Sequence, residues 1–208
     1  MKKIITYNSA AEALDALDNG GRFYKTETQA NDGIIDKSEL EHLGGTFADR
    51  QQMILFLAMS IIKLEESEKE LVFSKLDSDL IKAYEKFKPK ELPPSKAKLK
   101  GTLSSNVIII GTPELIDDSS NFKGSIMFPR SVGNSSILMM TPLVEEYDVY
   151  KIKDETSPKS FTVAHLNEFD KIYDKKMILG GVIKELKISE DEYEIRDKFL
   201  DITYHANF

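Results

Sequence analysis

Apolar residues in the first part of the chain recur at helical spacing. Ser9 can cap a helix whose apolar stripe contains Leu14 and Leu17. Asn19-Gly20-Gly21 predicts the end of this helix, because glycine readily adopts the left-handed conformation that closes a helix. A second short helix is predicted over residues 37–43. The pattern therefore begins with two short helices.

Two longer apolar segments predict further helices. Residues 53–64 are apolar on nearly every helical face, so we expect this helix, capped by Thr46 or Asp49, to be buried on most sides. The sequence Ser67-Glu68-Lys69-Glu70 has the pattern of a capping box, and helical spacing continues after it, with a second cap at Asp77. Together these segments predict an N-terminal helical bundle.

Three prolines, Pro89, Pro93 and Pro94, interrupt the helical pattern, since proline has a fixed φ and no backbone N–H. After them the chain changes to β-branched runs that are separated by glycines and turn residues. The predicted strands cover residues 107–110, 125–128, 136–140, 149–152, 161–166 and 177–188.

This change of pattern divides the chain into a helical domain at 1–92 and a strand-rich domain at 96–208, with the boundary near Ser95. A last capping pattern, Ser189-Glu190-Asp191-Glu192, predicts a closing helix that continues through Ile202. The expected fold class is α+β, with an N-terminal helical bundle followed by a mainly antiparallel, small β-barrel-like domain and a C-terminal helix.

Composition restricts the function classes. The 208 residues include no cysteine, which excludes disulfides, thiolate metal sites and cysteine nucleophiles and fits a reducing compartment. Polar residues follow Met1-Lys2-Lys3-Ile4-Ile5 before an apolar stretch of signal-peptide length develops, so we expect a cytoplasmic protein. The longest apolar run, 53–62, is far below the roughly 20 residues that span a bilayer. We therefore expect no membrane insertion.

Charge and aromatic residues bear on nucleic acid as a partner. The formal net charge is −7, which repels a phosphate backbone at long range and disfavours nucleic acid. Four aromatic residues of the strand-rich half are candidates for a base-stacking platform. They are Tyr147, Tyr150, Phe161 and Phe169. Because acidic residues surround the neighbouring lysines, core packing is the favoured interpretation of these aromatics.

Residues 28–40 contain a glycine, two aspartates and a glutamate at the spacing of a calcium-binding loop, with Gly33 directly after an aspartate. This stretch resembles the EF-hand family, in which the sixth loop position is glycine, the seventh offers a backbone carbonyl and the twelfth is a bidentate glutamate. The resemblance implies calcium as the ion. The ligands that it implies are Asp32, Ile34, Asp36 and Glu39.

The loop departs from the family at several positions. Thr28 and Ala30 stand at the first and third positions, where the family has carboxylates, so any calcium binding should be weak. No second loop is present to pair with Ile35 at the eighth position. We favour a turn followed by a helix that Ser38 or Asp36 caps. A degenerate loop kept as a helix-packing scaffold and a weak calcium site are the alternatives.

The strand-rich half carries a second resemblance. Residues 150–154, the hairpin loop at 154–159 and residues 177–183 are similar to the middle hairpin and last strand of an oligonucleotide-binding (OB) barrel. Gly180-Gly181 stands where a barrel strand would need to bend sharply. The resemblance implies a small closed barrel and makes single-stranded nucleic acid the alternative class of partner.

Signals for catalysis are few. His42, His165 and His205 are isolated in the sequence and lack the spacing of a metal-binding pair. An acid/base pair of His165 and Glu168 at a barrel mouth is conceivable, and a pocket that also gathers Asp154 would favour an enzyme. The favoured interpretation places His165 at a solvated strand end, and we name no catalytic residue.

These observations favour a non-enzymatic binding or scaffold protein that mediates protein–protein interaction, with a weak or vestigial calcium site. An OB-like protein that binds single-stranded nucleic acid is the alternative, and an enzyme with an unrecognised carboxylate and histidine site is the third. The helical half has more apolar surface than a small bundle needs. A protein partner or a homodimer is therefore expected, with Phe56, Met59 or Phe73 at the interface.

Overall fold

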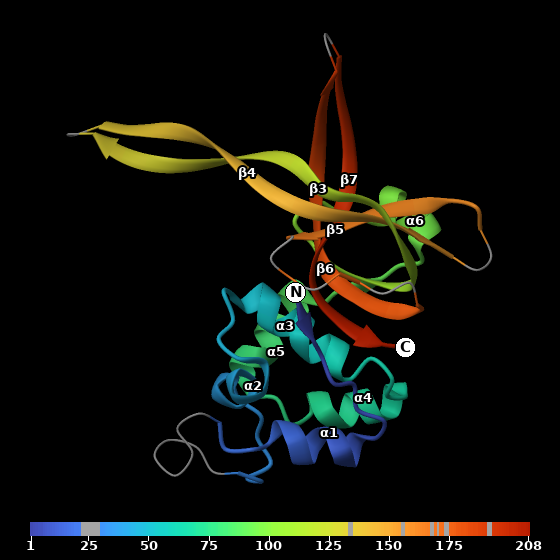
Figure 1. The fold of residues 1–208 in the computed structure, drawn as a ribbon. Coiled ribbons are helices and arrows are strands. Elements are labelled where there is room, and N and C mark those ends of the chain that lie inside the picture. The colour runs from blue at the N-terminus through green and yellow to red at the C-terminus, as the bar shows by residue number, and fades with distance from the viewer. Residues whose placement is uncertain are drawn as a thin grey trace.

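The computed structural model describes residues 1–21, 30–132, 135–154, 157–166, 169, 171–172, 175–190 and 193–208, with the backbone alone for 117–146 and 186–196. Within these residues the helices are α1 (Ala10–Leu17), α2 (Lys37–Gly44), α3 (Arg50–Ser60), α4 (Glu66–Phe73), α5 (Ser78–Phe87) and α6 (Pro94–Lys100). The strands are β1 (Lys2–Lys3), β2 (Lys90–Glu91), β3 (Asn106–Val132), β4 (Ser135–Lys153), β5 (Ser160–Leu166), β6 (Met177–Glu190) and β7 (Tyr193–Asn207). The α+β class is confirmed. The helices α1 to α5 lie together on one side of the strands (Figure 1).

The first two helices begin and end where the sequence predicts. The Ser9 hydroxyl accepts the Glu12 N–H at 3.2 Å and caps α1. Gly20 and Gly21 follow α1 with φ values of 80° and 64°, which are left-handed conformations that favour glycine. Helix α2 begins after its cap Asp36 and ends before Gly45, where φ is 81°.

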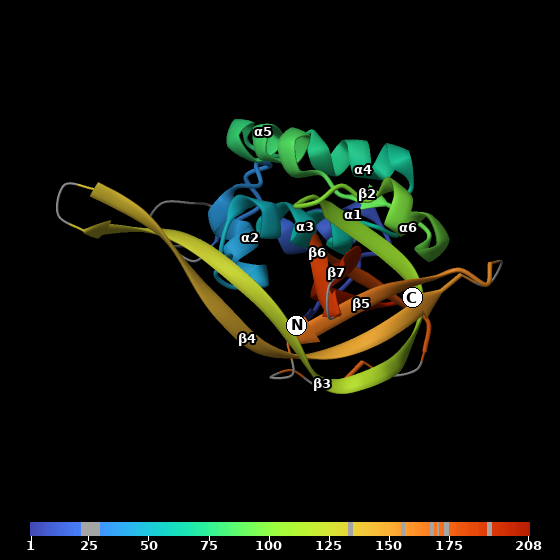
Figure 2. The same cartoon turned by 90° about the horizontal axis from the view of Figure 1, so that it is seen from above.

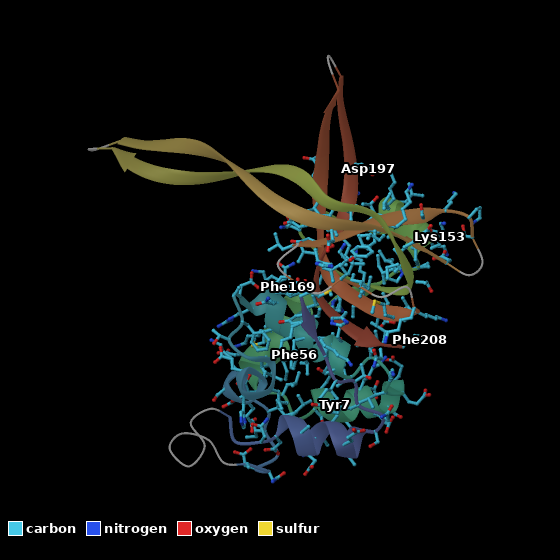
Figure 3. The ribbon with its side chains drawn as sticks, in the orientation of Figure 1. Tyr7, Phe56, Lys153, Phe169, Asp197 and Phe208 are labelled. Carbon is cyan, nitrogen blue, oxygen red and sulfur yellow. The ribbon has the colours of Figure 1, made fainter. Side chains whose placement is uncertain are left out.

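Helix α3 is buried along its length after the first turn, as its apolar faces predict. Asp49 caps it by accepting the Gln52 N–H at 2.8 Å. The ring of Phe56 lies 6.0 Å from that of Tyr204 on β7 (Figure 3), and α3 also contacts β3 and β6. The strands therefore cover apolar surface of α3 that the sequence assigned to a partner. Phe56 and Met59 are buried within the chain, and Phe73 is partly buried.

The second helical pair differs from its prediction in one cap. Glu65 and Glu68 form the capping box of α4, so the helix begins before Ser67. The cap at Asp77 is confirmed, because its carboxylate accepts the Leu80 N–H at 2.7 Å and opens α5. The Glu68 carboxylate also accepts the Ala10 N–H at 3.0 Å, which joins α4 to the start of α1.

The proline segment is more ordered than a linker between two domains would be. Helix α5 ends at Phe87, before the prolines, as their chemistry requires. Pro94 then opens the short helix α6, since proline is tolerated in the first turn of a helix, where its missing N–H is not needed. Lys98 of α6 forms an ion pair with Asp197 of β7 at 2.7 Å (Figure 3).

The strands form one seven-stranded mixed sheet. β3 pairs with β4 and β4 with β5, both antiparallel; β5 pairs with β7 in parallel; β7 pairs with β6 and β6 with β3, both antiparallel. These five pairings lead from β3 back to β3. The short strands β1 and β2 add parallel pairs to β7 and β3.

The predicted closing helix is wrong, because residues 193–207 form strand β7. Leu200, Ile202, Tyr204 and Ala206 are buried at every second position, which is the period of a strand with one face on the core. The Ser189 capping pattern lies at the β6–β7 hairpin, where Ser189 pairs with Glu194. Long-range pairing with β6 thus overrides a local helix signal.

The described residues form three apolar clusters. The first joins the helices to the strands and contains Ile4, Leu55 and Met59 together with Ile178 and Tyr204. The second lies among the strands and α6, and a smaller third one lies among β4, β5 and β7. Residues of both predicted domains share the first cluster, and β1, from the first residues of the chain, pairs with β7 near its end.

Two hairpins continue beyond the body of the sheet as two-stranded ribbons (Figure 1), and the β3–β4 ribbon is also seen to extend in Figure 2. In the β3–β4 ribbon, twelve successive pairs run from Asn121 with Glu146 to Val132 with Ser135. In the β6–β7 ribbon, six pairs run from Glu185 with Lys198 to Glu190 with Tyr193. Within the described residues no third strand pairs with either stretch. The sequence predicted separate short strands in place of the long ones.

Candidate functional site

The loop that resembles an EF-hand is closed by carboxylates that bind backbone N–H groups. Asp36 caps α2 by accepting the Glu39 N–H at 3.0 Å, and Glu39 accepts the Asp36 N–H at 3.0 Å in return. The second oxygen of Glu39 accepts the Gly20 N–H at 2.6 Å, and Gly20 lies near the start of the connection between α1 and α2. Glu39 is 1% exposed. Both of its oxygens are therefore used to hold the loop ends together.

Burial raises the pKa of Glu39, although the N–H groups of Gly20 and Asp36 act in the opposite direction. The nearby carboxylates of Asp36 and Asp18 raise it further. A bidentate calcium ligand needs both oxygens to face the ion. In this structure they face N–H donors, so Glu39 has the geometry of a structural residue that links α1 to α2 through backbone hydrogen bonds, and we call it a staple.

Asp18 is a loop residue that the sequence analysis missed. It is 7% exposed, and its carboxylate accepts the N–H groups of Asp32 at 3.1 Å and Gly33 at 2.7 Å. Its position directly after α1 gave no sign of this role, because the contact spans more than a dozen residues of intervening chain. Asp18 and Glu39 together close the loop from inside.

The four predicted ligands are only partly brought together. Asp36 and Glu39 are in contact, whereas Asp32 accepts the Ile34 N–H at 2.9 Å in its own turn, and Ile34 is 54% exposed. Thr28 lies outside the described residues, and Ala30 forms a β-bridge with Asn19. Among the described residues, no group of three or more His, Asp or Glu side chains could hold a metal ion. Calcium binding stays a prediction.

The eighth loop position has a partner that the sequence did not reveal. The Ile35 N–H donates to the Lys75 carbonyl at 2.7 Å, and the Asp77 N–H donates to the Ile35 carbonyl at 2.9 Å. Ile35 is fully buried, and its bridge partner Leu76 lies between α4 and α5. This contact joins the two helical pairs, as a helix-packing scaffold would require.

His165 is buried inside the sheet, so its predicted place at a solvated strand end is wrong. It is 0% exposed and stacks on Tyr150 with ring centroids 5.6 Å apart. Its pairing register places it beside Phe161 and Val163 on the alternating face that packs in the strand core. The alternation was predicted, whereas the burial of His165 on this face was not.

The acid/base site considered from the sequence does not assemble. His165 pairs with Asp148 of β4. Asp154 follows six residues later, just after β4, and six residues correspond to about 20 Å along an extended strand. Asp154 instead accepts the Ser95 N–H at 3.3 Å, at the start of α6. Glu168 lies outside the described residues. Asp154 lines a surface cavity of about 410 Å³ with Glu91, Leu92, Pro93, Ile108, Lys153 and Lys176 among its other walls, and His165 is not part of it.

Asp148 is a second residue that the sequence analysis passed over. It is 0% exposed, and neither carboxylate oxygen has a hydrogen-bond partner in the part of the chain that the structure describes. Its partner across the strands is His165. Buried polar groups are almost always hydrogen-bonded, so this carboxylate is unusual among the described residues.

Three of the four candidate stacking aromatics are core residues. Tyr147 is 5% exposed, Tyr150 1% and Phe161 3%, whereas Phe169 is 42% exposed. Core packing is confirmed for the first three. A stacking platform would need open ring faces, and Phe169 alone offers one.

Comparisons with known proteins add no assignment. No protein-family model matches the chain, and no curated protein is similar to it. Within the described residues, the helices are too short or too polar to cross a bilayer.

Proposed function

We propose that this chain is a non-enzymatic binding protein that takes up a protein partner on its β3–β4 ribbon. The observation that carries the proposal is the backbone of this ribbon. Beyond Tyr147 its strands pair only with each other in the described part of the chain, and the ribbon leaves the body in two perpendicular views (Figures 1 and 2). Unpaired strand edges are the surfaces to which a partner strand can add.

The composition of the ribbon supports a protein partner. Residues 124–143 contain nine apolar residues and a single charged one, Arg130, in a chain with 30% charged residues. An isolated two-stranded hairpin is at best marginally stable in water, and added strands or packing stabilise it. A long, uncharged edge is otherwise a site of aggregation. A bound partner would both stabilise the hairpin and cover its uncharged edge.

The five strand pairings support a rigid base for the ribbon. Their order, with the single parallel pair between β5 and β7, is that of a five-stranded OB-type barrel, and we propose that the strands close in this way. In such a barrel the first and last hairpin loops carry ligand contacts. Here the β3–β4 and β6–β7 ribbons occupy these two positions.

Single-stranded nucleic acid is the second candidate, because the same pairing order favours it. The charge of the chain opposes it: the net charge is −7, and the β6–β7 ribbon and its base, residues 184–198, contain six acidic and four basic residues. A strand-binding groove needs basic residues along the backbone and aromatic rings open to bases. The protein partner is therefore preferred.

The test compares three chains by affinity capture from the cells that make the protein. In one variant Asn-Gly replaces residues 124–143, which joins the paired residues Lys123 and Val144 through a two-residue turn. In the control variant Asn-Gly replaces residues 187–196, between Leu186 and Asp197 of the other ribbon. We expect the full chain and the control to retain the same partner, and the β3–β4 variant to lose it by at least about tenfold, roughly 1.4 kcal/mol.

Equal retention by all three chains would contradict the proposal. Sedimentation velocity on the same chains identifies a second copy as the partner if only the β3–β4 variant loses dimers. Salt-dependent binding of a single-stranded oligonucleotide that survives both ribbon deletions would favour the second candidate.

A further inference from the structure

Tyr150 and His165 form a buried hydrogen-bond relay inside the strands. The Ile172 N–H donates to the Tyr150 hydroxyl at 3.0 Å, and this hydroxyl lies 3.3 Å from Nε2 of His165. On the other side of the ring, Nδ1 lies 2.8 Å from the carbonyl of Leu166. The relay thus connects β4, β5 and the chain that follows β5.

The donors and acceptors of the relay determine where its protons lie. A carbonyl oxygen can only accept, so Nδ1 of His165 carries the proton that faces Leu166. The Tyr150 hydroxyl accepts from Ile172 and has one proton to donate, for which Nε2 of a neutral His165 is the acceptor at 3.3 Å. Burial, as the largest cause, lowers the pKa of His165 and so favours this neutral imidazole, in which Nε2 accepts.

Asp148 is placed to receive a charged imidazole. It lies directly opposite His165 in the antiparallel register, where Cβ atoms are about 5 Å apart. Its carboxylate is fully buried and has no donor in the described residues. Buried polar groups are almost always hydrogen-bonded, so this carboxylate is an acceptor that is available to the titratable ring beside it.

Other charged groups also face His165. The carboxylates of Asp148 on β4 and Asp201 on β7 raise its pKa, and the amino group at the start of the chain lowers it. Asp201 is already in an ion pair with Lys184 at 2.6 Å. His205 on β7 has its own pKa lowered by burial, then by Lys3, the amino group, His165 and Lys175. Asp148 is the one of these groups that is fully buried and without a partner in the described chain.

We propose that the Tyr150–His165–Asp148 cluster is a proton-driven switch that changes the partner of His165. At neutral pH, Nε2 accepts from Tyr150, and the relay holds the backbone at Ile172. When Nε2 takes a proton from the solvent, it becomes a donor, the bond from Tyr150 breaks, and the imidazolium pairs with the Asp148 carboxylate. The only reactant that the step requires is this proton, and no covalent bond between heavy atoms changes. Acidification therefore frees the Tyr150 proton and weakens the tie between β4 and Ile172.

The switch has a defined effect on stability. The folded pKa of His165 is lowered, so the unfolded chain takes up this proton first as the pH falls. The contribution of the neutral His165 ring to the free energy of unfolding is complete above pH 6.5, the pKa of histidine in the unfolded chain. This contribution decreases as the pH falls from 6.5 to the folded pKa. Below the folded pKa this contribution no longer changes, because both states are protonated.

Nuclear magnetic resonance of the full chain tests the proposal directly. The nitrogen shifts of the His165 ring, assigned with His42→Asn and His205→Asn variants, should show the Nδ1–H form at neutral pH. They should show the doubly protonated ring at lower pH while the chain is still folded. In the same titration, the protection of the Ile172 amide from hydrogen exchange, corrected for the intrinsic pH dependence of exchange, should decrease. These measurements need no substitution in the cluster itself.

Two variants should move the His165 pKa in opposite directions. Asp148→Asn removes the partner of the charged ring and should lower the pKa by about one unit. Tyr150→Phe removes the donor to the neutral ring and should raise it by about half a unit to one unit. Tyr147→Phe is the matched control. Tyr147 pairs with Leu166, one position away from the Asp148–His165 pair, so it lies on the opposite face of the strands, and its substitution should leave the His165 pKa unchanged.

Three results would overturn the switch. One is an Nε2–H ring in the wild-type chain at neutral pH. Another is a ring that remains neutral until the chain unfolds in acid. The third is a shift of the His165 pKa in the same direction, or no shift, in both Asp148→Asn and Tyr150→Phe. None of these measurements involves the β3–β4 ribbon, so they are independent of the proposed partner.

Discussion

Among the side chains that the structure describes, three acidic ones are almost wholly buried, and their surroundings differ at the scale of single atoms. Asp18 and Glu39 each accept two backbone N–H groups, so their burial is compensated by hydrogen bonds. Asp148 accepts none from the described residues. The first two residues stabilise one loop, whereas the third has an unfilled acceptor beside a histidine. Burial alone therefore does not indicate what a carboxylate does.

Glu39→Ala should strongly destabilise the fold, because it leaves the N–H groups of Gly20 and Asp36 without their acceptor in a buried site. We expect the free energy of unfolding to decrease by about 2–4 kcal/mol in urea denaturation. Glu70→Ala, at an exposed position of α4, is the control and should change it by less than about 0.5 kcal/mol.

The same measurement separates a staple from a metal ligand. If Glu39 acts through N–H groups alone, the loss in Glu39→Ala should be equal with and without about 10 mM calcium, a concentration about tenfold above the dissociation constants of even the weakest extracellular sites. A wild-type chain that calcium stabilises, and whose stabilisation Asp32→Asn removes, would instead support the weak calcium site.

At the scale of elements, α3 and β6 meet through a glycine. A Cβ on Gly180 would overlap Sδ of Met59 and approach Cδ1 of Leu55 to 3.2 Å. The helix can therefore lie close to the strand only because this position has no side chain. The sequence analysis noticed Gly180-Gly181 as a bend, and the register shift between these residues agrees with a local irregularity. It did not foresee that a helix packs there.

Gly180→Ala should decrease the free energy of unfolding by about 1–3 kcal/mol through overpacking against Met59. Met59→Ala removes the overlapping atoms, so the double variant should lose less than the sum of the two single losses, by about 1 kcal/mol. Urea denaturation of the four chains gives this coupling energy.

Gly181→Ala is the matched control for this cycle. Its Cβ would overlap the backbone carbonyl of Asp201 on β7, which no change at Met59 can relieve. Losses in Gly181→Ala and Met59→Ala should therefore add. A fully additive result for Gly180→Ala and Met59→Ala would contradict the packing of α3 on β6.

At the scale of the molecule, the two halves of the sequence share structure. Ile4 donates its N–H to the His205 carbonyl at 2.8 Å, so the first strand is attached to the last. Leu55 and Met59 of α3 lie in one apolar cluster with Ile178 and Tyr204 of the strands. A helical layer that covers the strands should stabilise both parts together.

We expect the helical half and the strands to unfold as one unit. Hydrogen exchange at α3 and β7 amides should report the same free energy of opening, because each element loses its apolar cover when the other unfolds. An isolated chain of residues 96–208 should lack a dispersed nuclear magnetic resonance spectrum. Two separate transitions, or a folded fragment, would instead support independent domains at 1–92 and 96–208.

Local signals in the sequence determined the helices well. Ser9, Asp49 and Asp77 cap helices where predicted, and the glycines after α1 and α2 end them, because capping and helix termination depend on residues within one turn. The apolar faces of α3 correctly indicated burial, and the loop at 154–159 correctly separated β4 from β5. The turn at Asp32-Gly33 and the Asp36 cap of the following helix, which were favoured over a calcium loop, are confirmed.

Only the tertiary structure decided how these pieces meet. The closing segment became β7 because pairing with β6 outweighed a local capping pattern. Glu39 closes a loop through Gly20, nineteen residues away. His165 is buried opposite Asp148 by strand register. Each of these outcomes depends on contacts between residues far apart in the chain, and hydrophobic spacing along a single segment contains no information about such partners.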